Sequence, residues 1–168
     1  MRTLLATLTL LLLTACSADT SQTTDPFPHP APTTTTTSPP ARESPEHFVR
    51  RRVDLANQLQ RDGDPSALLA VSSGCGECAA IGHGVAKIYA SGGWLRGCTW
   101  IIRPGISTVR VLGQRVVMRF DIDVTRCRYK ADADTPPVAQ PATRAPVQVV
   151  VTRRSGKLNM VEFSRLTT

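Results

Sequence analysis

The ten residues 116–125 read VVMRFDIDVT, and their pattern decides the fold class. Apolar and polar side chains alternate along this stretch, which is typical of a strand with one face on the core and one face in solvent. The apolar set comprises Val116, Met118, Phe120, Ile122 and Val124. The intervening Arg119, Asp121 and Asp123 are therefore expected to face away from the core. A strand of this kind belongs to an antiparallel sheet that is covered on one side.

Further strands are predicted on both sides of this one. They cover residues 94–103, 109–111, 147–153 and 158–165. Turn residues at Pro104-Gly105, Gly113-Gln114 and Ser155-Gly156 separate them, and the last pair forms a hairpin turn. Residues 131–146 are rich in proline and poor in apolar side chains, so we expect a loop there.

Three helices are predicted ahead of the strands. The first covers residues 44–61 and opens with a Ser-Pro-Glu start signal. A short second helix lies between Asp64-Pro65 and Ser73-Gly74, and the third covers residues 75–90. Arg52 interrupts the apolar stripe of the first helix, along which its aliphatic stem can pack. Helices that precede an antiparallel sheet predict an α+β fold, with the helices packed on the concave face of a strongly bent sheet.

The amino terminus has the features of a lipoprotein signal peptide. The short positive segment Met1-Arg2 precedes an apolar run over residues 4–13, which is about half the length needed to span a bilayer. Small residues then precede Cys16, and the sequence Leu-Thr-Ala-Cys resembles a lipobox. We therefore expect residues 1–15 to be cleaved off and Cys16 to carry lipid chains such as palmitate. An ordinary secretory signal with a chance cysteine is the alternative.

Residues 16–43 form a predicted tether between the lipidated cysteine and the domain. This segment contains five consecutive threonines, residues 33–37, with prolines on both sides. It lacks the apolar side chains that would offset the entropy cost of ordering, so we expect it to be disordered and extended. O-linked sugars on its threonines are a further expectation. The folded domain is then expected over residues 44–168.

The composition suits one small domain outside the cytoplasm. The 168 residues carry a formal net charge of +7, and only 5% of them are aromatic, which predicts an aliphatic core. A basic balance can indicate nucleic-acid binding. Here the charges are spread along the chain, and Arg50-Arg51-Arg52 is the one basic run. We therefore expect no nucleic-acid partner, and an anionic lipid surface or wall polymer is the more fitting counterpart.

Four cysteines remain once Cys16 is assigned to the anchor, an even number that suits an oxidising compartment. Cys75 and Cys78 lie one helical turn apart, within disulfide range. Cys98 and Cys127 lie on different predicted strands and are the remaining pair. A thioredoxin-type redox pair in the CGEC segment and a four-cysteine zinc site are the alternatives. No strand precedes CGEC and the second pair is widely spaced, so both alternatives are disfavoured.

Three segments carry a resemblance to known families. They are residues 44–49 (SPEHFV), residues 75–78 (CGEC) and residues 89–93 (YASGG), the last ahead of a Trp-containing strand. The order of elements resembles the cone-shaped fold of the nuclear transport factor 2-like group, also called SnoaL-like. With the lipobox and the tether, the segments resemble an actinobacterial lipoprotein family, domain of unknown function 6318. The resemblance covers about residues 40–168 and implies no known activity.

The resemblance also implies a ligand pocket between the helices and the sheet, and some cone folds are isomerases or hydrolases that use a cavity acid. Glu162, Trp100 and Tyr89 are the candidate pocket residues. Glu162 shares its parity with Leu158 and Met160, which would place it on the inner face. A partly buried or edge-exposed carboxylate is the favoured alternative. No catalytic residue, metal ligand or cofactor site is assigned.

These observations predict a lipoprotein anchored on the extracytoplasmic face of the cell membrane, with a binding or interaction domain. Its expected partners are the membrane, through the lipid anchor, and a small molecule or an envelope protein. The alternative is a small cone-fold enzyme that uses a cavity carboxylate. The polar row Arg119, Asp121 and Asp123 is a candidate face for a homodimer, with plain solvent-facing surface as the alternative.

Overall fold

The computed structural model describes residues 42–166. The predicted signal peptide, Cys16 and nearly all of the predicted tether lie outside the described residues. Three helices come first in the described part, and strands follow them to its end. The helices are α1 (Pro45–Asp62), α2 (Ser66–Ala70) and α3 (Gly76–Ala90). The strands are β1 (Trp94–Arg96), β2 (Trp100–Ile102), β3 (Ser107–Leu112), β4 (Arg115–Val124), β5 (Cys127–Lys130), β6 (Val138–Gln140), β7 (Thr143–Arg154) and β8 (Lys157–Arg165).

Helix α1 begins and ends at the residues that the start and stop signals indicate. The Ser44 hydroxyl accepts a hydrogen bond from the backbone N–H of His47 at 3.2 Å, and Pro45 follows at the first helical position. At the other end Gly63 adopts a left-handed φ of 78°, and its N–H donates to the Leu59 carbonyl at 2.8 Å. A glycine is favoured there because a side chain is strained at positive φ.

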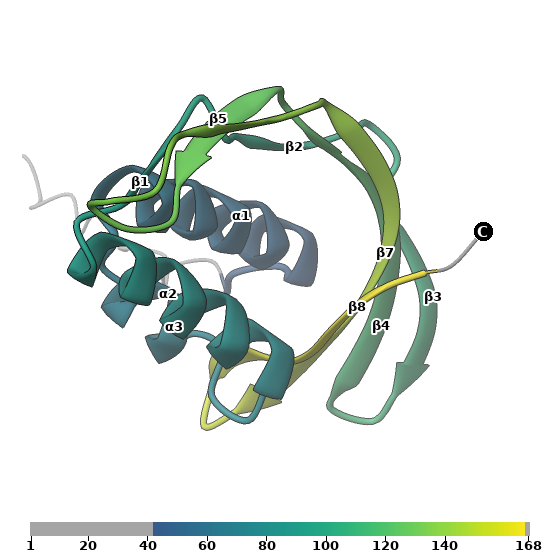
Figure 1. Ribbon diagram of the computed structural model, residues 1–168. Coiled ribbons are helices and arrows are strands. Elements are labelled where there is room, and N and C mark those ends of the chain that lie inside the picture. Colours follow the sequence, from purple (N-terminus) through teal and green to yellow (C-terminus); the bar gives the residue numbers. More distant parts are fainter. Residues whose placement is uncertain (1–41, 167–168) are drawn as a thin grey trace, which may run out of the picture. The chain divides into compact units, whose positions relative to one another are not determined.

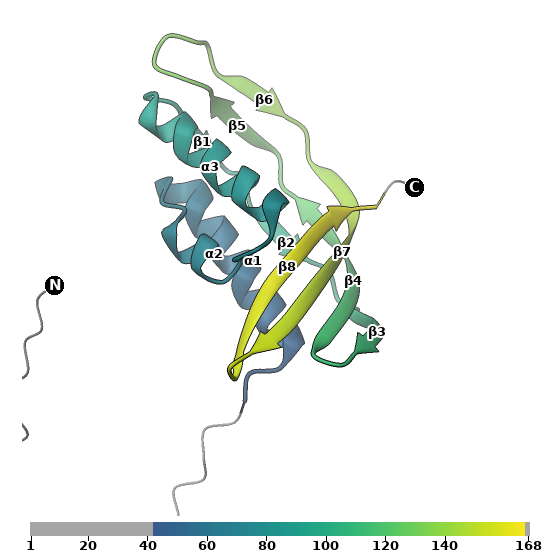
Figure 2. The same cartoon turned by 90° about the horizontal axis from the view of Figure 1, so that it is seen from below.

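The strands form two antiparallel sheets. The larger one has the order β2-β4-β7-β8, with β3 also paired to β4, and the smaller one has the order β1-β5-β6. The sheets bend around the helices, which lie inside the curve (Figure 1). The β5 and β6 strands and the β7–β8 turn lie at opposite ends of the domain (Figure 2). The predicted α+β architecture, with helices on a strongly bent antiparallel sheet, is confirmed.

The core forms where the concave sheet face meets the helices. The alternation over residues 116–125 is confirmed, because Met118, Phe120 and Ile122 are buried whereas Arg119 and Asp121 are exposed. Apolar side chains from the helices and the sheet form one cluster, which includes Phe48, Val49, Val53, Met118, Phe120, Ile122, Val147, Val149, Val151, Met160 and Phe163. Burial of this aliphatic and aromatic surface is the main force that holds the helices to the sheet.

Arg52 lies in the middle of the contact between the helices and the sheet. The sequence predicts that its aliphatic stem packs on the core, but its guanidinium is buried as well. Only 1% of the residue is exposed, and none of its three guanidinium nitrogens has a hydrogen-bond partner among residues 42–166. Its guanidinium carbon lies 4.9 Å from the centroid of the Phe163 ring, a cation–π distance. Burial lowers the pKa of the Arg52 guanidinium to about 10. The domain therefore buries a positive charge with only an aromatic face to compensate it.

Two of the predicted segment boundaries are wrong. Residues 94–103 are two strands in different sheets, because Gly97 turns the chain with a φ of 76° between β1 and β2. The predicted loop over residues 131–146 contains β6 and the beginning of β7. Pro146 lies within β7, and its carbonyl accepts a hydrogen bond from the Leu166 N–H at 2.9 Å. The nitrogen and the carbonyl of a strand residue point to the same side, so the Pro146 nitrogen also faces the end of β8. The missing N–H therefore removes no bond to β4, and the proline is tolerated.

Gly63 also permits the close approach of α3, which makes it a sensitive position. A Cβ atom at Gly63 would lie 2.5 Å from Cγ of Tyr89, whereas one at Gly74, whose φ is 85°, would meet no atom within 4 Å. We expect Gly74→Ala to lower the free energy of unfolding by about 1 kcal/mol through backbone strain alone. Gly63→Ala should lower it by about 3 kcal/mol, since overpacking adds to the same strain. Urea unfolding followed by tryptophan fluorescence measures the free energy of unfolding of both variants. Equal decreases would show that the contact with Tyr89 does not contribute to the effect of Gly63→Ala.

Candidate functional site

A cleft opens between the helices and the place where the two sheets meet, and we call it the cone-mouth cleft. Its volume is about 200 Å³. It is lined by Ala56, Leu59, Gln60, Ile81, Val85, Leu95, Cys98, Trp100, Val124, Cys127, Gln140 and Arg165. The lining is mostly apolar, with amide groups and one guanidinium as its polar groups. This composition is typical of a site that binds a small molecule.

Two amide side chains of α1 hold the wall that carries Trp100. The Asn57 amide donates to the Trp100 carbonyl at 2.9 Å and accepts from the Trp100 N–H at 2.7 Å. One turn later, the Gln60 amide lies between the Cys98 carbonyl and the Trp100 indole N–H. In the amide orientation that satisfies both neighbours, it donates to the carbonyl at 3.1 Å and accepts from the indole at 3.2 Å. Both amides are at least nine-tenths buried. Trp100 is therefore fixed at its backbone and at its ring before any ligand binds.

Of the three predicted pocket residues, Trp100 alone lines the cone-mouth cleft. Its ring also stacks on Phe163, with the ring centroids 5.9 Å apart. Tyr89 lies behind the cleft, where its hydroxyl donates to the Gln60 carbonyl at 2.7 Å. Tyr89 thus supports the α1 segment that holds Trp100 and does not itself reach the lining described above.

Glu162 is exposed, so the expectation from its parity is wrong. The structure agrees with the favoured alternative of a partly buried or edge-exposed carboxylate, in its exposed form. The reason is a bulge in β8. Val150 pairs with Glu162, but Val151 pairs with Met160, which leaves Val161 as an extra residue between them. One extra residue reverses the faces of the residues beyond it, so that Phe163 becomes buried and Glu162 turns outward.

The polar row of β4 faces outward as predicted. Asp123 accepts from Arg103 at 3.0 Å and from Arg144 at 2.7 Å, and Asp121 is exposed. The hydrogen bond from Arg144, with a smaller contribution from Arg103, holds the pKa of the Asp123 carboxyl below its ordinary value. Arg119 donates to the Gln148 side chain at 2.9 Å on the same face. These carboxylates are thus separated from the cleft by the sheet.

The four cysteines of the domain form the two expected disulfides. Cys75–Cys78 staples the start of α3, with a Cα–Cα distance of 5.2 Å. Cys98–Cys127, with a Cα–Cα distance of 4.7 Å, joins the segments that cross between the two sheets and lies in the wall of the cone-mouth cleft. Both pairs are oxidised, in contrast to a zinc site with four thiolate ligands. Within residues 42–166, no group of three or more His, Cys, Asp or Glu side chains is placed to hold a metal ion.

The described lining of the cone-mouth cleft offers apolar contacts and a few hydrogen-bonding groups. Among the described side chains that line it, none is a carboxylate, a histidine or a serine. Gln60 and Trp100 use their polar atoms on each other, whereas Gln140 and Arg165 are exposed at the edge. The sequence reasoning missed Asn57 and Gln60, although two amides three residues apart beside an apolar stripe are the signal that points to them. No helix in the described part of the chain is long and apolar enough to cross a membrane.

Comparisons with known proteins show likeness in structure only. The sequence matches no protein-family model and no curated protein. The intermembrane space region of the chloroplast protein ARC6 is similar to this chain with a TM-score of 0.58 and 12% identity, over 73% of this chain and 94% of that one. Aln2 from a Streptomyces species has a TM-score of 0.45 and 14% identity, over 74% of this chain and 93% of that one.

A third similar structure is an uncharacterised protein with a cystatin-like fold from Caulobacter vibrioides, with a TM-score of 0.47 and 8% identity, over 73% of this chain and 89% of that one. The similar structures include cone-shaped folds of the nuclear transport factor 2-like and SnoaL-like kind. At these identities the likeness concerns the fold alone. It agrees with a bent sheet that encloses helices.

Proposed function

We propose that this chain is a lipoprotein tethered to the extracytoplasmic face of the cell membrane, and that its domain binds a small, mostly apolar ligand in the cone-mouth cleft. The observation that carries the binding proposal is the lining of the cleft, which is apolar, with one aromatic ring fixed in advance by two amides. The lipobox at Cys16 and the Thr/Pro-rich tether support the address. Membership of the lipoprotein family called domain of unknown function 6318 is part of the same proposal.

The size and polarity of the cleft limit the ligand class. Its volume of about 200 Å³ lies below the range of roughly 300–1,000 Å³ that is usual for drug-sized ligands. The Arg165 guanidinium and the Gln140 amide at its edge are suited to one anionic or hydrogen-bond-accepting group. A compact apolar molecule with a single acidic end fits both features.

The alternative of an isomerase or hydrolase is less well supported. Such an enzyme needs a titratable group within hydrogen-bond reach of the substrate. The candidate acid, Glu162, lies on the outer side of β8. A protein partner, or a second copy of the chain on the outer face of β4, is compatible with the same tethered module.

A probe with the predicted ligand chemistry tests the cleft. The fluorescent anion 2-naphthoate combines one compact aromatic group with one carboxylate, and we expect it to bind the full-length protein saturably. Val85→Trp, which places a large ring in the cleft wall, should weaken this binding by at least about tenfold, since tight packing excludes a second occupant. Lys87→Trp adds the same ring on the exposed side of α3 and is the matched control. Equal fluorescence titrations of all three proteins would refute the proposed site.

The anchor has a separate test. Cells that express the protein with radiolabelled palmitate should incorporate label into the wild-type chain, and Cys16→Ala should incorporate none. Two or more acyl chains are needed for stable attachment, so the unlabelled variant should also leave the membrane fraction. Equal labelling of both chains would refute lipidation at Cys16 and leave the cleft proposal untouched.

A further inference from the structure

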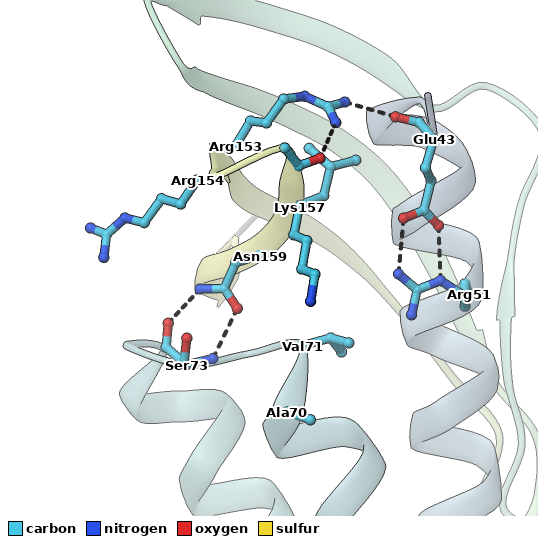
Figure 3. Close-up of a pocket in the computed structure, with 11 residues that line it drawn as sticks. Glu43, Arg51, Ala70, Val71, Ser73, Arg153, Arg154, Lys157 and Asn159 are labelled. Atoms are coloured by element: carbon cyan, nitrogen blue, oxygen red, sulfur yellow. Dashed lines mark hydrogen bonds and ion pairs between the residues drawn. The ribbon is translucent and has the colours of Figure 1, made fainter. Parts of the chain in front are cut away.

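A second pocket lies beside the β7–β8 turn, and it shares no lining residue with the cone-mouth cleft. We call it the basic pocket. Its volume is about 540 Å³, and four cationic side chains line it, namely those of Arg51, Arg153, Arg154 and Lys157. Figure 3 shows them around a hollow between the β7–β8 turn, the start of α1 and the segment that follows α2. The one carboxylate in the lining is that of Glu43.

Arg153 fixes the frame of the basic pocket. Its guanidinium donates to the Gly156 carbonyl at 2.9 Å and to the Glu43 carbonyl at 2.7 Å. It therefore ties the β7–β8 turn to the residues that lead into α1. On the opposite side, the Asn159 amide donates to the Ser73 carbonyl at 2.6 Å and accepts from the Ser73 N–H at 3.1 Å. These bonds hold both walls of the pocket at a set distance.

Arg51 already binds a carboxylate from the same chain. Its Nε and one terminal nitrogen donate to the two Glu43 carboxylate oxygens at 2.8 Å and 2.9 Å. This two-point geometry is the one in which a guanidinium also binds phosphate. The bond from Arg51 holds the pKa of the Glu43 carboxyl below its ordinary value. Glu43 is therefore ionised at neutral pH, and it occupies the position that an external anion would take on Arg51.

Lys157 contributes a positive charge that is not paired with Glu43. In the view of Figure 3 its side chain extends into the basic pocket between Asn159 and Arg51, toward Val71, whereas Arg154 extends away from the centre. The Lys157 ammonium has no carboxylate or carbonyl partner among the described residues. The pocket thus combines one carboxylate with four cations, and its unpaired ammonium faces the hollow.

We propose that the basic pocket binds a phosphate group, with the Lys157 ammonium and the Arg51 guanidinium as its ligands and Glu43 as an internal carboxylate that competes for Arg51. Two kinds of ligand contain such a group, namely an anionic lipid with a phosphodiester headgroup and a free phosphate. The proposal rests on contacts within residues 42–166 and holds whether or not the cone-mouth cleft binds an apolar molecule. It predicts opposite effects for the loss of Lys157 and the loss of Glu43.

Calorimetric titration of the full-length protein tests this with two probes. Glycerophosphoglycerol, the deacylated headgroup of phosphatidylglycerol, represents the lipid source, and inorganic phosphate represents the free anion. We expect Lys157→Gln to weaken binding by about tenfold, because it removes a charge-assisted hydrogen bond. Glu43→Gln should tighten binding about fivefold, since an amide competes less well than a carboxylate for Arg51. Lys87→Gln removes an exposed charge on α3 and serves as the control.

Each outcome has a defined meaning. If the wild type binds glycerophosphoglycerol more tightly than inorganic phosphate, the result supports a lipid headgroup as the ligand. If it binds inorganic phosphate more tightly, the result supports a free phosphate. The same affinity in the wild type, Lys157→Gln and Lys87→Gln would overturn the site, and so would the absence of saturable binding of either probe at millimolar concentration. Weaker binding by Glu43→Gln would overturn the role of Glu43 as a competitor. Circular dichroism spectra of each variant show that it is folded.

Discussion

Replacing Arg52 with methionine is expected to raise the free energy of unfolding by about 2 kcal/mol. Arg52 is 1% exposed and lies between α1 and the sheet, with the Phe163 ring as its neighbour. Burial lowers the pKa of its guanidinium well below the ordinary value of arginine, to about 10. A difference of that size corresponds to about 3 kcal/mol of cost for keeping the charge in the folded state. The cation–π contact with Phe163 returns about 1 kcal/mol of it.

The sign of this effect follows from proton linkage. The Arg52 guanidinium binds its proton less tightly in the folded state than in the unfolded state, so the cost is fully present below about pH 10 and disappears as the pH rises toward the ordinary pKa of arginine. At neutral pH the substitution should therefore shift the urea midpoint upward. Methionine has a similar length and adapts to irregular space, so it leaves no large cavity.

Arg50→Met is the matched control for this change. Arg50 is exposed on the same helix and pairs with Glu46 at 2.8 Å. Its loss should change the free energy of unfolding by less than about 0.5 kcal/mol. A decrease in stability for Arg52→Met that exceeds this control would mean that the buried guanidinium has a compensating partner, and the prediction would then be wrong.

Removal of the Cys98–Cys127 disulfide is expected to lower the free energy of unfolding by about 3.5 kcal/mol in the chain-entropy model. The crosslink joins residues 29 apart in sequence, so its loss frees a long loop in the unfolded chain. The Cys75–Cys78 crosslink spans 3 residues, and the same model gives about 1.6 kcal/mol for it.

The comparison of paired alanine variants tests the model directly. Cys98→Ala with Cys127→Ala should shift the urea midpoint about twice as far as Cys75→Ala with Cys78→Ala. Treatment of the wild type with a reductant should reproduce the sum of the two losses. The opposite ranking of the two variants would show that packing around the start of α3 outweighs loop entropy.

The local sequence pattern was enough to predict the elements whose apolar residues repeat regularly along their whole length. The strand over residues 116–125 and the start of α1 at Ser44 follow from alternation and capping, which depend on neighbouring residues only. The break at Gly97 and the strand within residues 131–146 were not predictable in this way. They depend on which strands are available to pair, and β5 provides partners for both β1 and β6.

The site was predictable in part for a related reason. Trp100 lies at the cleft, but the face of Glu162 depends on an extra residue at Val161, and a bulge of this kind leaves no mark in the alternation that precedes it. The basic pocket joins Arg51 to residues about a hundred positions further along the chain. Charged residues so far apart in the sequence give no sign that they form a cluster, because the fold alone brings them together in one pocket.

The segments that cross between the two sheets run side by side. Thr99 donates its N–H to the Thr125 hydroxyl at 2.9 Å, Thr125 returns its own N–H to the Thr99 carbonyl at 3.0 Å, and Cys98–Cys127 bonds the same two crossings covalently. The small sheet is thus joined to the larger one by one covalent crosslink and two hydrogen bonds at the same place. In a reducing solution the two hydrogen bonds would remain, but the wall of the cone-mouth cleft that contains Cys98 and Cys127 would lose its covalent support.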